Sequence, residues 1–65
     1  MNASHLFIVV PAQFPTDQGK VVDGWQLSAP EDDKGKRAVR GIEVGQAGEA
    51  ILQARADKLN EAIPF

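Results

Sequence analysis

The chain has 65 residues, a net charge of −2 at pH 7, one histidine and no cysteine. This composition excludes disulfide bonds and thiolate metal sites and leaves no Cys/His cluster, so we expect no metal and no other cofactor. The weak negative charge provides no general attraction to nucleic acids or to anionic membranes.

A domain of this size buries only about 60% of the surface that its unfolded chain exposes, so its core is small. Folds of this length often gain stability from disulfides, metals or oligomerisation. Because the chain has no cysteine, association with another protein or with a second copy is the route that remains. The sequence therefore predicts a chain that works as part of a complex.

The N-terminal segment contains the first predicted strand. Residues 1–4 are expected to be a flexible terminus. Residues 5–10 are nearly continuously apolar and partly β-branched, and they are expected to form a strand that is central in the sheet or covered on both faces. Pro11 should end this strand because proline cannot donate a ladder hydrogen bond. A loop is predicted over residues 11–19, with Phe14 turned back onto the core. The apolar stretch is too short for a signal peptide or a membrane span, which favours a soluble, cytoplasmic protein.

Residues 20–28 form the second predicted strand. Asp23 would share a face with the apolar residues of this strand, so a β-bulge at Gly24 is predicted to shift the register and remove the conflict. Period-two alternation places three apolar side chains on that face: Val21, Trp25 and Leu27.

The polar connection over residues 29–35 has two interpretations. A tight turn with Gly35 in the left-handed region would join two strands as a hairpin. Alternatively, Ser28 and Glu31 have the spacing of a capping box and would begin a helix. Gly35 would then limit this helix to about one turn.

Residues 37–44 form the third predicted strand, and Gly45 allows a sharp exit from it. Alternation places Ala38, Ile42 and Val44 on one face of this strand, and Arg37, Val39 and Glu43 on the other.

The last third of the chain, residues 45–63, has the pattern of an amphipathic helix. The helix should end near Ala62, because Pro64 disfavours the helical conformation of Ile63. Its apolar residues recur at the spacing that places them on one helix face: Leu52, Ala56, Leu59 and Ile63, with Ile51 and Ala62 on one flank.

The expected fold class is α+β, with a small three-stranded antiparallel sheet in the order β-β-β-α and the C-terminal helix packed on one face. We expect a single small domain over residues 1–65. The helix should contact some of the apolar sheet residues, which are Phe7, Val9, Val21, Trp25, Leu27, Ile42 and Val44.

Four basic residues cluster after the polar connection, namely Lys34, Lys36, Arg37 and Arg40. Such a cluster can grip phosphates or an acidic partner. It can also be a solvated turn, because the acidic residues 31–33 lie beside it and lower the local potential. The neighbouring acidic charges favour the solvated turn.

Two single residues are further candidates for contact with a partner. Arg55 falls inside the apolar sector of the helix, where an arginine either lays its stem over the core or marks a contact with another protein. Trp25, the one tryptophan, suits the centre of the core, although tryptophan is also enriched at binding hot spots. Val22 and Val39 are expected on the sheet face that the helix leaves uncovered.

No motif for catalysis accompanies the single histidine, so an independent enzyme is not expected. We interpret the chain as a non-enzymatic protein-binding module whose partner is another protein or a second copy. By analogy, short acidic chains of this kind include phage- or mobile-element-encoded inhibitors and adaptors. The alternatives are a nucleic-acid-binding protein that uses residues 34–40, and an accessory subunit of an enzyme. The predicted partner-binding residues are Val22, Trp25, Arg37, Val39, Arg40 and Arg55.

Overall fold

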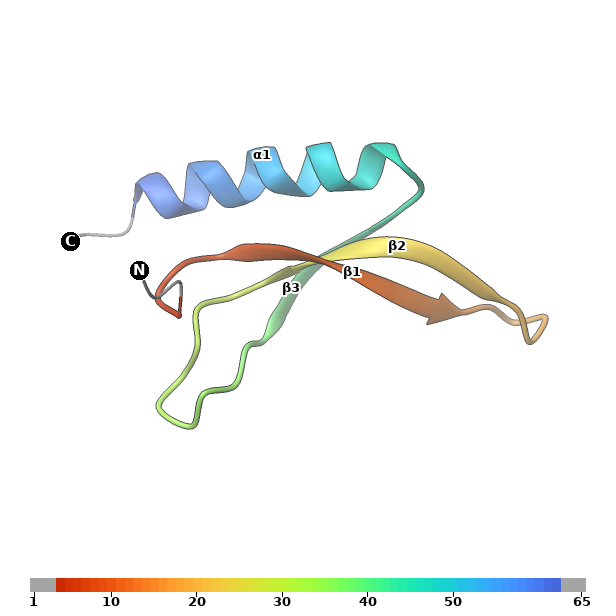
Figure 1. Ribbon diagram of the computed structural model, residues 1–65, viewed down its shortest axis with the longest axis horizontal. Helices are drawn as coiled ribbons and strands as arrows, with labels where there is room; N and C mark the ends of the chain where they lie inside the picture. The colour runs from red at the N-terminus through yellow and green to blue at the C-terminus, as the bar shows by residue number, and fades with distance from the viewer. Residues whose placement is uncertain (1–3, 63–65) are drawn as a thin grey trace.

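The computed structural model describes residues 4–62 and has three antiparallel strands in one open sheet, followed by one helix across one face (Figure 1). The strand order is β1-β2-β3, so β2 is central. The predicted α+β fold class is confirmed. The elements are β1 (Ile8–Pro15), β2 (Val21–Ser28), β3 (Val39–Val44) and α1 (Ala47–Glu61).

Strand β1 continues through both prolines, so the prediction that Pro11 ends it was wrong. The predicted central position was also wrong, because β1 is an edge strand that pairs only with β2. Proline is tolerated on an edge strand when its nitrogen faces away from the neighbouring strand. Pro11 and Pro15 are four residues apart and therefore on the same side of the ladder. The predicted loop shrinks to a turn in which Thr16 N–H donates to the Lys20 carbonyl at 2.7 Å.

The connection between β2 and β3 is a turn, as the first of its two interpretations predicts. The Gly35 N–H donates to the Asp32 carbonyl at 3.0 Å, and Gly35 has a φ of 77°. The Asp32 carboxylate accepts hydrogen bonds from the main-chain N–H groups of Lys34 and Lys36, both at 2.9 Å. Ser4, expected to be part of a flexible terminus, accepts a hydrogen bond from Glu31 N–H at its carbonyl; residues 1–3 lie outside the described residues.

The predicted bulge at Gly24 is wrong, because the β1–β2 register runs without interruption through the pair Ala12 and Gly24. The irregularity lies instead between β2 and β3. Leu27 pairs with Gly41 and the next residue of β2 pairs with Val39, so that Arg40 is the extra residue. One extra residue moves the residues beyond it to the opposite face. Val39 therefore shares a face with Ile42 and Val44, and the predicted division of β3 was wrong.

The core lies between α1 and the centre of the sheet. Leu27, Leu52 and Ala56 are fully buried there, and Phe7, Val9 and Trp25 pack against them. The four sheet residues of this core are among the seven of which the helix was expected to contact some, and the other three, Val21, Ile42 and Val44, are exposed. Of the helix stripe, Leu59 and its flank residue Ile51 are also exposed, and Ile63 lies outside the described residues.

Two glycines let α1 approach β3 closely. Gly48 is buried against Glu43, where an added Cβ would lie 3.0 Å from the Glu43 carbonyl oxygen. Gly41 lies beneath the helix, where an added Cβ would lie 3.4 Å from Cδ2 of Leu52 and 3.2 Å from Nη1 of Arg55. The turn before the helix uses Gly45, with a φ of 88°.

The molecule is elongated, with extents of 44, 26 and 18 Å. Its radius of gyration is 13.0 Å, against about 11 Å for a compact chain of this length. The radius of gyration is large because the β1–β2 hairpin extends beyond β3. Residues 21–23 of β2 pair with β1 but not with β3, whose pairing begins at Gly24. The turn of this hairpin projects beyond the start of α1 (Figure 1).

Candidate protein-binding surface

The face of the sheet opposite α1 carries apolar side chains on both outer strands, with Gly24, Gln26 and Ser28 between them on the central strand. Leu27 points at the helix. Because side chains alternate along a strand, the other set of β2 positions points away from the helix, namely Val22, Gly24, Gln26 and Ser28. The strand register then assigns the residues of β1 and β3 to the same side. We call this surface the open face, and its apolar residues are Ile8, Val10, Ala12, Phe14, Val22, Val39, Ile42 and Val44.

Several side chains of the open face are substantially exposed. Val22 is 38%, Val39 50%, Ile42 51% and Val44 61% accessible, whereas the four β1 residues are half-buried. Scattered exposed apolar residues are normal on a protein surface, but a continuous apolar patch is typical of an interaction site. No ionisable side chain occupies the paired positions of this face in the described strands.

Val22 and Val39 both lie on the open face, as the sequence predicts, but at opposite ends of it. Val39 pairs with Ser28, and Val22 lies six residues earlier on β2, which corresponds to about 20 Å along the strand. Ile42, Val44 and the apolar residues of β1 fill the area between and beside them.

The sequence also predicts an apolar first strand on the uncovered face. The prediction that Phe14 turns back onto the core was wrong, because Phe14 lies in β1 and pairs with Val22 on the open face. Ile42 and Val44 were missed because the predicted strand over residues 37–44 lacked the extra residue at Arg40.

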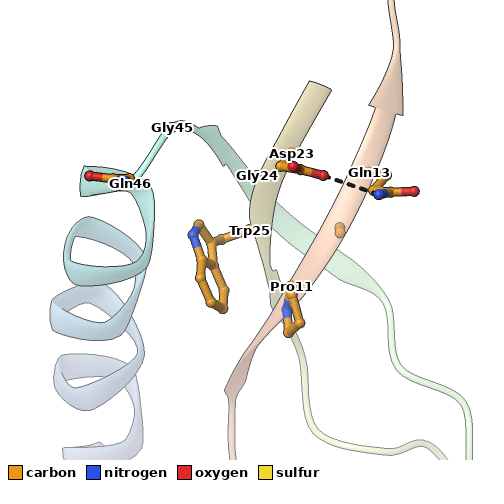
Figure 2. A pocket seen from close by; sticks show the side chains of 8 residues that line it. Pro11, Gln13, Asp23, Gly24, Trp25, Gly45 and Gln46 are labelled. Carbon is orange, nitrogen blue, oxygen red and sulfur yellow. Dashed lines mark hydrogen bonds between the residues drawn. The ribbon is translucent and has the colours of Figure 1, made fainter. Parts of the chain in front are cut away.

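Trp25 lies on the helix side of the sheet. It is half-buried against the core and lines an open pocket of about 690 Å³. Figure 2 shows its indole between Gln46 at the start of α1 and Pro11 on β1. Asp23 supplies a carboxylate to this pocket, which accepts a hydrogen bond from the Gln13 amide at 3.1 Å. A lone carboxylate held by an amide does not form the convergent pair that general acid–base catalysis uses.

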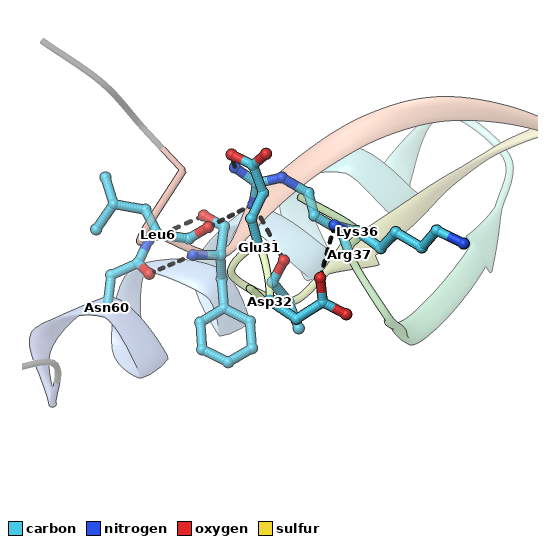
Figure 3. A network of polar contacts seen from close by, with 8 residues as sticks. Leu6, Glu31, Asp32, Lys36, Arg37 and Asn60 are labelled. Carbon is cyan, nitrogen blue, oxygen red and sulfur yellow. Dashed lines mark hydrogen bonds and ion pairs between the residues drawn. The ribbon is translucent and has the colours of Figure 1, made fainter. Parts of the chain in front are cut away.

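Arg37 is held within the chain (Figure 3). Its Nη1 donates to the carbonyl oxygens of Leu6 at 2.7 Å and Ala29 at 3.1 Å, and its Nη2 lies 3.8 Å from the Glu31 carboxylate. The side chain is only 18% exposed. The guanidinium therefore joins the start of β1 to the end of β2, which weakens the predicted basic cluster as a phosphate-binding surface.

The other predicted arginines lie in two different places. Arg40 is the exposed extra residue of the β3 irregularity, at the border of the open face. Arg55 lies on α1 with its guanidinium over Gly41, on the opposite side of the sheet. The six predicted residues therefore do not form one site: Val22 and Val39 share the open face, whereas Trp25 and Arg55 belong to the helix side.

Within residues 4–62 no group of His, Asp or Glu side chains is arranged to hold a metal ion. The described helix is also not long and apolar enough to cross a membrane. Comparisons of the chain with protein families, with curated proteins and with solved structures find no match.

Proposed function

We propose that the protein is a non-enzymatic binding module that acts by association with another protein chain, and that the open face is its binding surface. An inhibitor or adaptor would act in this way. The proposal rests on the apolar residues that both outer strands, β1 and β3, and Val22 of β2 present on the face that α1 leaves uncovered. Covering apolar surface is the main favourable term in most protein association.

The small core supports this proposal. The fully buried cluster consists of Leu27, Leu52 and Ala56, while the apolar residues of the open face outnumber it. A sheet of this kind usually has one face on the core and one polar face in water. Here the face that should be polar carries valine, isoleucine and phenylalanine instead, which matches a surface that a partner covers.

Val21 and Val22 provide a matched test, because they are adjacent on β2 and point to opposite sides of the sheet. Val21 is 60% exposed and Val22 is 38% exposed. Val22→Glu combined with Val39→Glu should abolish capture of the partner from cells of the source organism, while the Val21→Glu variant should retain it. Far-ultraviolet circular dichroism checks that each variant stays folded. A partner retained equally by both variants would contradict the proposal.

A further inference from the structure

We infer that the partner at the open face is a second copy of this chain, packed sheet to sheet about a two-fold axis that passes near Gln26. This inference rests on the proposed function and names the occupant of the same surface. A two-fold interface brings the same patch of both subunits together, so the patch must be complementary to itself. Two features of the open face meet this requirement, and a third, at the edge of β1, disfavours the addition of a strand.

The first feature is the position and chemistry of Gln26. It lies on the central strand, paired with Val10 on one side and with Ile42 on the other, so it is at the middle of the open face. It is half-buried, and its Nε2 lies 3.4 Å from the Ser28 hydroxyl oxygen. A carboxamide carries both donors and an acceptor. Two such groups across a two-fold axis can bond each other, and a buried polar group then keeps its hydrogen bonds.

The second feature is the neutrality of the open face. Its paired positions carry apolar side chains, Gly24, Gln26 and Ser28, with Arg40 at the border. Interfaces between different proteins generally use complementary charges to select the partner. A charged patch would repel its own copy across a two-fold axis, whereas an uncharged patch does not. Arg40, between Val39 and Ile42 in β3, is the one ionisable residue of the described strands at the border of this face.

The third feature is the protection of the sheet edge. The two prolines of β1 remove donors from its free edge, at Pro11 and Pro15, so this edge is a poor template for adding a strand. Face-to-face packing needs no free edge. Two sheets packed in this way lie about 10 Å apart, with their strands within about 30° of each other.

The size of the open face predicts a weak dimer. Strands β1 and β2 have eight residues each and β3 has six. The open face therefore covers at most about 26 Å by 14 Å, an area on the order of 400 Å² per copy or less. A stable specific interface covers about 800 Å² per partner, and smaller ones belong to transient complexes. The dimer should therefore form only as the protein concentration rises.

The test uses sedimentation velocity from about 5 to about 500 µM protein, a range suited to weak complexes. The wild-type chain should shift from monomer to dimer. Gln26→Glu and Gln26→Lys, each alone, should weaken the dimer at least about tenfold, because like charges meet at the axis. An equimolar mixture of the two variants should dimerise again. Gln13 is exposed on the helix side of β1. The same two substitutions at Gln13 should leave the concentration dependence of dimerisation unchanged.

A wild-type chain that stays monomeric throughout this range would overturn the inference, as would a mixture that fails to dimerise. The proposed function is judged separately. If the wild type is monomeric but a different protein is captured through Val22 and Val39, the inferred dimer is wrong. The proposal that the open face binds a protein would then still hold. If neither dimerisation nor capture responds to changes on the open face, both are wrong.

Discussion

The side-chain amide of Asn60 bonds both polar groups of the Phe7 main chain (Figure 3). Its Oδ1 accepts from the Phe7 N–H at 2.7 Å, and its Nδ2 donates to the Phe7 carbonyl at 3.1 Å. The amide thus satisfies the main-chain donor and acceptor of Phe7, as a neighbouring strand would. It fastens the last turn of α1 to the chain just before β1, where Phe7 packs against the core.

Replacement of Asn60 by alanine should lower the free energy of unfolding by about 1–3 kcal/mol, because two partly buried main-chain groups lose their partner. Asn60→Asp keeps only the acceptor for the Phe7 N–H and should also destabilise the fold. Urea unfolding at low protein concentration measures both variants. Gln53→Ala is the control, since Gln53 makes only an exposed contact with Asp57. A loss no larger than that of the control would contradict the structural role of Asn60.

Gly48→Ala should destabilise the protein by about 1–3 kcal/mol, although alanine favours helices more than glycine does. The added Cβ would lie 2.9 Å from the Glu43 Cβ and 3.0 Å from its carbonyl oxygen, so the helix must move away from β3. Thermal unfolding measures the effect. At Gly41 the nearest atom to an added Cβ is the mobile guanidinium of Arg55. Gly41→Ala should therefore lower the free energy of unfolding by less than Gly48→Ala does. A larger loss of stability in Gly41→Ala than in Gly48→Ala would contradict this account of the packing.

Arg37→Lys should lower the free energy of unfolding by about 1–3 kcal/mol, because an ammonium group cannot reproduce the planar donors that reach two carbonyls. Leu6 and Ala29 would lose the bonds that they accept at 2.7 and 3.1 Å. Lys34→Ala, at an exposed position in the same connection, should have almost no effect in the same urea titration. Equal stability of Arg37→Lys and the wild type would show that the hydrogen bonds from Arg37 to the Leu6 and Ala29 carbonyls contribute little to folding.

Replacing Pro11 and Pro15 together by valine should increase self-association through the edge of β1. The substitutions restore two N–H donors and raise β propensity on a free edge, which is the usual template for aggregation. Light scattering over time, at a concentration where the wild type is monomeric, detects the change. Gln13→Val, on the helix side of the same strand, adds a branched side chain outside the open face without adding a donor, and it should scatter no more than the wild type.

Local signals were sufficient to predict the order of the elements, the turn between β2 and β3 and the turn before the helix. Gly35 in the turn and Gly45 before the helix have φ values of 77° and 88°, which the sequence indicates because glycine adopts this region without steric cost. The end of the helix at Glu61 follows from a rule about the residue before proline. These features depend on a few neighbouring residues, so the sequence contains the information directly.

The faces of the strands depended on pairing that the sequence does not display. The extra residue at Arg40 places Val39, Ile42 and Val44 on one side, and the edge position of β1 lets the strand continue through Pro11. Both follow from which strand lies beside which, and a shift of one residue reverses every side chain beyond it.

The sequence by itself determined that this chain forms three strands and one helix in the order β-β-β-α. Only the tertiary structure decided which residues of the three strands share the open face, with Gln26 on its central strand, and that the Arg37 guanidinium is held by main-chain carbonyls of the same chain. The physical reason is that secondary structure follows from local sterics and periodicity, whereas an interaction surface is made of residues distant in the chain.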